Sequence, residues 1–195
     1  RNTKGIPNRL FKNLGDFRFK DVSAGSGTGD AGWAQAVSHT DFDGDGWQDL
    51  VVGNDFGVNA YLRNRGDGTF EDVSAAIGTD KPSYSMGIAI ADLNGDDRPD
   101  FYISNIVVMD KDQKYVLPGE QTVMKFDPRT LAAMRVIEAN DLFLSSVASG
   151  GTTWRQSSLV DRGYASTGWS WDAHFFDMDN DGDDDLHVVN GVNPY

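Results

Sequence analysis

The sequence predicts an all-β fold, namely a β-propeller section of about three four-stranded blades from a larger ring, with one short helical insert. Two observations indicate this. The chain repeats itself, because residues 12–23 match residues 63–74 at an offset of 51, the same offset that separates Asp41 from Asp92. Between these landmarks lie short segments rich in β-branched and aromatic residues and bounded by Gly, Asn and Asp, which is typical of strands. Four strands in about fifty residues is the size of a propeller blade.

One repeat unit shows the expected order of elements. Its four strands are expected at 33–40, 49–53, 59–63 and 69–73, with an acidic loop after the first and a Gly-Asp-Gly turn after the third. The segments Leu50–Gly53 and Phe101–Ser104 are too apolar for a half-exposed sheet, as expected where blades stack on both faces. An aromatic residue precedes each acidic loop by eight positions, and an Asn follows each loop start by thirteen: Trp33, Tyr84 and Trp169, and Asn54, Asn105 and Asn190.

The repeat also predicts how the chain of 195 residues is divided. It begins with the last two strands of one blade and ends with the first two of another, so we treat residues 1–195 as one propeller section and expect the remaining blades outside them. Closed propellers typically have four to eight blades. Asp92 and Asp177 are 85 residues apart, which is 51 plus 34, and the additional residues form an insert at approximately 107–139. Within the insert, Asp127 as N-cap and Pro128 at the first helical position predict a short helix over 127–138.

Three acidic nonamers, Asp41–Asp49, Asp92–Asp100 and Asp177–Asp185, are the candidate metal sites. Each carries carboxylate or amide oxygens at positions 1, 3, 5 and 9, and a hard cation with six to eight oxygen ligands, Ca²⁺ above all, fits such a set. They are not EF-hands, because position 12 is apolar and a strand follows. We therefore expect about three Ca²⁺ sites. The expected side-chain ligands are Asp41, Asp43, Asp45 and Asp49; Asp92, Asn94, Asp96 and Asp100; and Asp177, Asp179, Asp181 and Asp185, with the backbone carbonyls of Trp47, Arg98 and Asp183 at position 7.

Position 6 distinguishes the second nonamer from the other two. Gly46 and Gly182 permit a tight turn there, whereas Asp97 replaces Gly in the second nonamer, which predicts a more strained and weaker site whose occupancy stays open. The alternative interpretation is three acidic hairpin turns without metal. Mg²⁺ fits less well, because it prefers few protein oxygens and retains water.

Composition and missing motifs exclude several classes of function. A net charge of −13 argues against nucleic acid or an anionic membrane surface as partner. The sequence has no cysteine and no apolar run long enough to span a bilayer. No nucleophile-elbow, zinc-protease or phosphate-loop motif appears, so we predict no enzymatic activity.

Other conspicuous residues have simpler explanations. His39, His174 and His187 are expected on strands near the acidic loops, and Trp33, Trp154, Trp169 and Trp171 are expected to pack between blades or in the core rather than to bind sugars. Arg65-Gly66-Asp67 spells a tripeptide that integrins bind. The preceding repeat has Leu14-Gly15-Asp16 at the same turn, which favours a turn role.

These motifs together resemble the FG-GAP/VCBS repeat family, the propeller repeats of integrin α-subunits and of many bacterial surface proteins. More narrowly, the chain resembles bacterial proteins related to cartilage acidic protein 1, which often carry an ASPIC/UnbV segment. The resemblance rests on residues 13–23 and 64–74, the three acidic nonamers and residues 168–182, and it covers nearly the whole chain except the insert. It implies a calcium-stabilised propeller that is secreted, periplasmic or on the cell surface.

The function predicted from these observations is a calcium-binding extracellular propeller module for adhesion or ligand binding. Its partner would be an unidentified protein or glycan ligand, with no nucleic acid and no membrane insertion within this chain. An alternative is the non-catalytic propeller portion of a secreted enzyme that acts on polysaccharide or phosphate esters. A third reading is a scaffold whose insert at 107–139 docks a partner.

Overall fold

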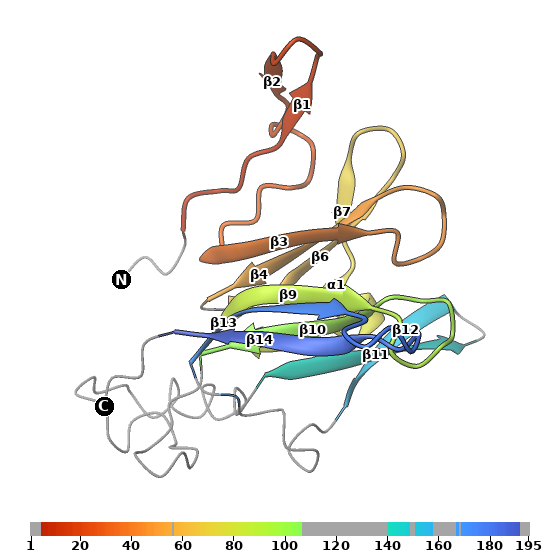
Figure 1. The fold of residues 1–195 in the computed structure, drawn as a ribbon. Helices are drawn as coiled ribbons and strands as arrows, with labels where there is room; N and C mark the ends of the chain where they lie inside the picture. The colour runs from red at the N-terminus through yellow and green to blue at the C-terminus, as the bar shows by residue number, and fades with distance from the viewer. Residues whose placement is uncertain are drawn as a thin grey trace.

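The computed structural model describes residues 5–55, 57–106, 140–148, 151–157, 167 and 169–191. The predicted insert at 107–139 and its helix lie outside these residues. The described part is almost entirely antiparallel β-structure arranged as two four-stranded sheets and two outer strand pairs (Figure 1). This is the predicted all-β propeller section of half, whole, whole and half blades.

The four sheets follow one another along the chain. The N-terminal pair contains β1 (Phe11–Asn13) and β2 (Phe19–Asp21). Blade 1 contains β3 (Ala34–Thr40), β4 (Asp49–Asn54), β6 (Ala60–Asn64) and β7 (Phe70–Asp72) in that order. Blade 2 contains β9 (Ser85–Ala91), β10 (Asp100–Asn105), β11 (Asp141–Ala148) and β12 (Gly151–Ser157). The C-terminal pair contains β13 (Ser170–Phe176) and β14 (Asp185–Asn190).

Three short elements were not predicted. The strands β5 (Gly57–Val58) and β8 (Pro82–Ser83) pair with each other between the blades. The helix α1 (Ser74–Ile77) follows β7 and ends at Gly78, which has a left-handed φ of 85°. Such a C-terminal position favours Gly, because other residues pay a steric cost there.

The strand pairing repeats with the sequence. Ala34 pairs with Asn54, Ser85 with Asn105 and Ser170 with Asn190, and a β-bulge follows each of these pairs at Gln35, Met86 and Trp171. The residue after each Asn donates its backbone N–H to the carbonyl of the repeated aromatic residue: Asp55 to Trp33, Ile106 to Tyr84 and Gly191 to Trp169. The aromatic and Asn landmarks therefore mark one recurring strand end.

Two hydrophobic clusters join neighbouring sheets. Between blades 1 and 2, Val51 and Tyr61 pack with Phe101, Phe143 and Trp154, all of them buried. Between blade 2 and the C-terminal pair, the cluster comprises Ala89, Tyr102, Leu142 and Ala173, with Phe175, Leu186 and Val188 packed against it. The prediction that Phe101–Ser104 is covered on both faces is confirmed, because every residue of β10 is buried. In β4 all residues except Leu50 are buried.

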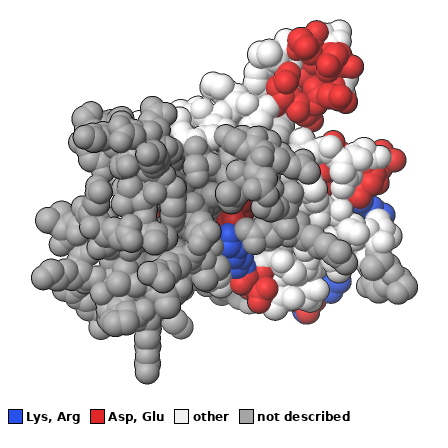
Figure 2. All heavy atoms as spheres, turned by 90° about the horizontal axis from the view of Figure 1, so that it is seen from below, with Lys and Arg blue, Asp and Glu red and all other residues white. Residues whose placement is uncertain are grey.

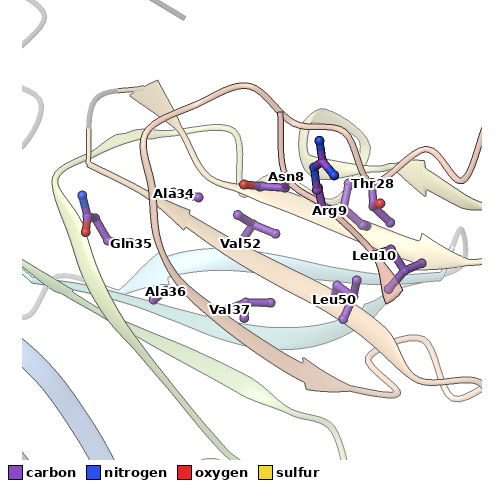
Figure 3. A pocket seen from close by; sticks show the side chains of 11 residues that line it. Asn8, Arg9, Leu10, Thr28, Ala34, Gln35, Ala36, Val37, Leu50 and Val52 are labelled. Atoms are coloured by element: carbon purple, nitrogen blue, oxygen red, sulfur yellow. The ribbon is translucent and has the colours of Figure 1, made fainter. Parts of the chain in front are cut away.

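The N-terminal pair is packed differently. Phe11 and Phe19 remain 51% and 59% exposed, and the outer face of blade 1, which includes Leu50, Val52 and Leu62, borders a groove of about 280 Å³ (Figure 3). Leu10 lines the other side of this groove. Trp154 is in the core as predicted, whereas Trp33 and Trp171 keep 46% and 48% of their surface exposed.

Candidate metal-binding loops

Each acidic nonamer forms the connection between the first and second strands of its sheet. We call them loop 1 (Asp41–Asp49), loop 2 (Asp92–Asp100) and loop 3 (Asp177–Asp185). The same kind of strand pair closes each loop: Thr40 with Asp49, Ala91 with Asp100 and Phe176 with Asp185. All three therefore lie at one end of the stacked sheets, on the right of Figure 1, and acidic side chains gather toward that side in Figure 2.

The first aspartate of each loop organises the backbone. In loop 1, Asp41 Oδ1 accepts the N–H of Gly44 at 2.8 Å and of Asp45 at 3.1 Å, and Asp41 Oδ2 accepts the N–H of Gly46 at 2.8 Å. Asp92 makes the same three contacts in loop 2, and Asp177 makes two of them in loop 3. Local side-chain to backbone hydrogen bonds of this kind are what Asp offers in turns. One loop conformation therefore recurs in three repeats.

The ninth position anchors each loop to the sheet. Asp49 Oδ2 accepts the N–H of Phe42 at 3.0 Å, and its Oδ1 accepts the N–H of Asn64 on β6 at 2.7 Å. Asp100 receives the equivalent bonds from Leu93 and from Ser145 on β11. Both aspartates are fully buried. In loop 3, Asp185 accepts the N–H of Met178 at 3.0 Å.

Position 6 has the left-handed conformation that the sequence predicted. Its φ is 91° at Gly46, 60° at Asp97 and 95° at Gly182. Asp97 makes the same hydrogen bond to Asp92 that Gly46 makes to Asp41, so loop 2 closes despite the missing Gly. Position 4 is also left-handed, at Gly44, Gly95 and Asn180, a requirement that the sequence analysis did not identify.

Two loops bring three carboxylates together. Asp41, Asp43 and Asp49, and likewise Asp177, Asp179 and Asp185, each offer an oxygen within 4.8 Å of the other two. The aspartates at position 5 are not in these groups. Each accepts the N–H of position 7: Asp45 from Trp47, Asp96 from Arg98 and Asp181 from Asp183. Loop 2 carries Asn94 at position 3, where the other loops carry Asp.

Two carboxylates of loop 1, those of Asp43 and Asp49, have raised pKa values. Burial raises the pKa of Asp49 to about 6. Burial, followed by the charge of Asp45, raises the pKa of Asp43. Two negative charges 4.8 Å apart, the upper limit of the oxygen separations in this group, repel each other by about 3 kcal/mol at an effective dielectric constant of about 20. A bound divalent cation would remove both penalties, and the all-oxygen donor set is the one that Ca²⁺ prefers.

Loop 2 is electrostatically different. Burial alone would raise the pKa of Asp92, but hydrogen bonds from the backbone N–H groups of Asp97, Asp96 and Gly95 outweigh it, and the pKa is lowered. Ser145 Oγ also donates to the Asp96 carboxylate at 3.0 Å, and Asn94 Nδ2 donates to the Ser145 carbonyl at 3.2 Å. The third strand of blade 2 thus holds loop 2 by side-chain contacts.

The sequence analysis missed this role of the third strand. Asn64 and Ser145 occupy equivalent positions, five residues after Asn59 and Asn140, and both donate a backbone N–H to the ninth aspartate. The signal available in the sequence is an Asn directly before the third strand of each blade, Asn59 and Asn140. Each of them accepts the N–H of the repeated Asn in the second strand.

The residues of the Arg-Gly-Asp turn and the histidines make local contacts within their own strands and turns. Arg65 and Arg63 both pair with Glu71, at 3.2 and 2.7 Å, and the Asp67 carboxylate accepts bonds from the Thr69 backbone and hydroxyl. The charged groups of the Arg-Gly-Asp turn are therefore engaged within their own hairpin. His39 Nδ1 lies 2.8 Å from Gln48 Oε1, and His174 faces His187 across β13 and β14.

Comparison with known proteins agrees with the repeat and its loops. A sequence profile described as "FG-GAP-like repeat" matches residues 41–103, which run from the start of loop 1 into β10. Cartilage acidic protein 1 of Homo sapiens is 34% identical over 92 residues, which is 47% of this chain and 14% of that protein. The proteins of the same name from Mus musculus and Xenopus tropicalis are 32% identical over 92 residues and 36% identical over 58 residues, covering 14% and 9% of their lengths.

This chain thus spans a small part of the relatives it matches. The matched repeat, the recurrence of its hydrogen bonds in all three loops and the stacking of four-stranded sheets agree with one another. Residues 41–103 match the FG-GAP-like repeat family, which supports the resemblance predicted from the sequence.

Proposed function

We propose that this chain is a non-catalytic, calcium-binding propeller module whose ions are structural and whose setting is extracellular, where it serves adhesion or ligand binding. Asp41, Asp43, Asp45 and Asp49 would hold one ion together with the Trp47 carbonyl. The equivalent residues of loops 2 and 3 would hold two more. Calcium would supply positive charge that fixes acidic loops between strands.

The observation that carries the proposal is the clustering of carboxylates in loops of one conformation. Hydrogen bonds to Asp41 explain the shape of loop 1, yet they do not explain why Asp43 and the buried Asp49 lie within 4.8 Å of it. An acidic turn without metal would be more stable with fewer charges. A cation bound only by the folded loop adds its binding free energy to the stability of the fold.

The setting follows from the type of site. Short loops such as these would belong to the weaker range of calcium sites, which fill only at the near-millimolar Ca²⁺ found outside the cytosol. The similar proteins are named for cartilage and for acidity, and this chain shares the acidity with a net charge of −13. Among the described residues, no helix has both the length and the apolar character required to cross a membrane.

Thermal unfolding with and without calcium tests the proposal. We expect millimolar Ca²⁺ to raise Tm and a chelator to reverse the rise, because a site held at one hundred times its Kd stabilises the fold by about 2.7 kcal/mol. Asp41→Asn should reduce the calcium-dependent part of Tm. Asp16→Asn is the matched control, since Asp16 is a 92% exposed aspartate with a left-handed φ of 50° outside any acidic loop. An unchanged Tm in both calcium and chelator would rule the proposal out.

A further inference from the structure

Loops 1 and 2 are connected by one long side chain. Arg98, at position 7 of loop 2, extends to loop 1 of the preceding blade and donates from Nη1 to the backbone carbonyl of Asp43 at 3.2 Å. Its own backbone N–H is held by the Asp96 carboxylate at 3.1 Å. Arg98 therefore has its backbone in one candidate site and its guanidinium in the next.

Loop 1 is shaped to receive this side chain. Gly44 lies directly beside the guanidinium, and a Cβ built on Gly44 would overlap Nη1 of Arg98. Gly44 also has a left-handed φ of 78°, which disfavours a larger residue there. The small residue at position 4 leaves room for the guanidinium, and the hydrogen bond to the Asp43 carbonyl defines the contact.

A second connection runs through the hydrophobic core. Phe42, the second residue of loop 1, is buried and packs edge-to-face on Trp154 with ring centroids 5.6 Å apart. Trp154 Nε1 in turn donates to the carbonyl of Pro99 in loop 2 at 2.8 Å. The end of loop 2 that follows Arg98 is thus connected to loop 1 through Trp154.

Loop 3 lacks the corresponding bridge to loop 2. Its position 7 is Asp183, whose side chain has no donor when ionised. The chain therefore contains its own comparison: one neighbouring pair of loops joined by an arginine, and one pair that is not.

We propose that Arg98 is a positioning residue that couples calcium binding in loop 2 to calcium binding in loop 1, so that each ion strengthens the binding of the other. The proposal rests on the function proposed above. Fixing the backbone of Arg98 in loaded loop 2 holds the guanidinium against the Asp43 carbonyl, and this orders loop 1 before its ion binds. Because Arg98 is charged whether loop 2 is loaded or empty, its repulsion of an ion in loop 1 stays the same, and only the ordering changes. When binding of one ion already orders the second loop, the second ion loses less conformational entropy on binding, which gives positive cooperativity.

Calorimetric titration of the full chain with Ca²⁺ tests the coupling. Asp177→Asn silences loop 3 in this set of variants, and Asp92→Asn then silences loop 2. The Asn keeps one oxygen for the N–H groups of Gly95 and Asp96 and loses the acceptor of the Asp97 N–H. With Arg98 present, silencing loop 2 should raise the Kd of loop 1 about tenfold, within the usual range of coupling between sites. With Arg98→Met, which keeps the apolar stem, the Kd of loop 1 should be the same whether loop 2 is intact or silenced.

The outcomes separate the two proposals. An equal effect of Asp92→Asn with and without Arg98, or no effect in either, overturns the coupling and leaves calcium binding intact. Absence of any calcium binding in the unmodified chain overturns both proposals. If Arg98→Met does not fold, as judged by thermal unfolding in chelator, Arg98→Ala replaces it, because it removes the donor together with the stem; undiminished coupling in that variant also contradicts the role of Arg98. In an Asp41→Asn background, silencing loop 3 should leave the Kd of loop 2 unchanged.

Discussion

At the scale of single residues, position 3 of the acidic loops determines how much charge each loop must neutralise. Loops 1 and 3 carry Asp43 and Asp179 there, and loop 2 carries Asn94. The side-chain oxygens of Asp43 and Asn94 accept the same backbone bond from position 5, at 3.2 and 3.0 Å. Asn can therefore replace Asp at this position without disturbing the backbone, which isolates the effect of the charge.

Asp43→Asn should have opposite effects without and with calcium. In chelator it should stabilise the fold by about 1 kcal/mol, because it removes the burial cost that raises the pKa of Asp43 and the repulsion from Asp45 and Asp41. In millimolar Ca²⁺ it should be destabilising by a similar amount, because the ion loses a charged ligand. Thermal unfolding under both conditions measures the two values. Asn94→Asp in loop 2 is the reciprocal control, and effects of the same sign in both solutions would contradict the role of charge.

Sequence reasoning at this scale worked where a repeat exposed a substitution. Three nonamers in register identified the recurring acidic positions of the loops and the unusual Asp97, whose φ of 60° is the left-handed value expected for a position that usually carries Gly. Ser145 was missed because its contact to Asp96 joins residues 49 apart in the chain. Neither periodicity nor propensity reports such a distance.

At the scale of elements, the repeated Asp-Val-Ser holds the third strand to the fourth. Ser74 Oγ donates to Asp72 Oδ1 at 2.5 Å and accepts the backbone N–H of Tyr61 at 2.9 Å, while the Val73 N–H donates to the Tyr61 carbonyl. The N-terminal pair repeats the arrangement with Ser23, which contacts Asp21 and the N–H of Leu10. This part of the repeat is therefore a structural clamp.

Ser74→Ala should destabilise the fold by about 1–3 kcal/mol, because it leaves the buried N–H of Tyr61 without an acceptor. Ser23→Ala removes the same contacts from the more exposed N-terminal pair, where water replaces them, and should cost less. Denaturant unfolding of the two variants gives both free energies. Equal losses would mean that the clamp does not depend on burial.

The elements that were predicted and those that were missed differ in how often their pattern recurs. The predicted ends of β3, β4 and β6 differ from the observed ends by no more than one residue, because the same strand pattern recurs in the neighbouring repeats. The strands β5 and β8 have two residues each, and α1 has four. Segments this short carry no periodicity and form only because the neighbouring blades position them.

At the scale of the whole molecule, stability is distributed unevenly along the stack of sheets. Blade 2 is covered on one side by blade 1 and on the other by the C-terminal pair, and its second strand is fully buried. The N-terminal pair has every strand residue exposed, although its backbone pairing is complete. Unlike the two blades and the C-terminal pair, it has no acidic loop.

Hydrogen–deuterium exchange should therefore follow burial in general and the acidic loops in the response to calcium. The backbone amides of β1 and β2 should exchange fastest among the paired strands, because local opening there exposes little additional apolar surface. Adding Ca²⁺ should slow exchange in the strand pairs that the acidic loops close, namely β3 with β4, β9 with β10 and β13 with β14, and should leave β1 and β2 unchanged. Mass spectrometry of peptides from each sheet, with Mg²⁺ as the control ion, resolves these regions. Equal protection of the N-terminal pair would show that calcium acts on the fold as a whole rather than through the loops. Protection confined to the three sheets with acidic loops is the expected result, because each ion stabilises the pairing of the first strand of a sheet with its second.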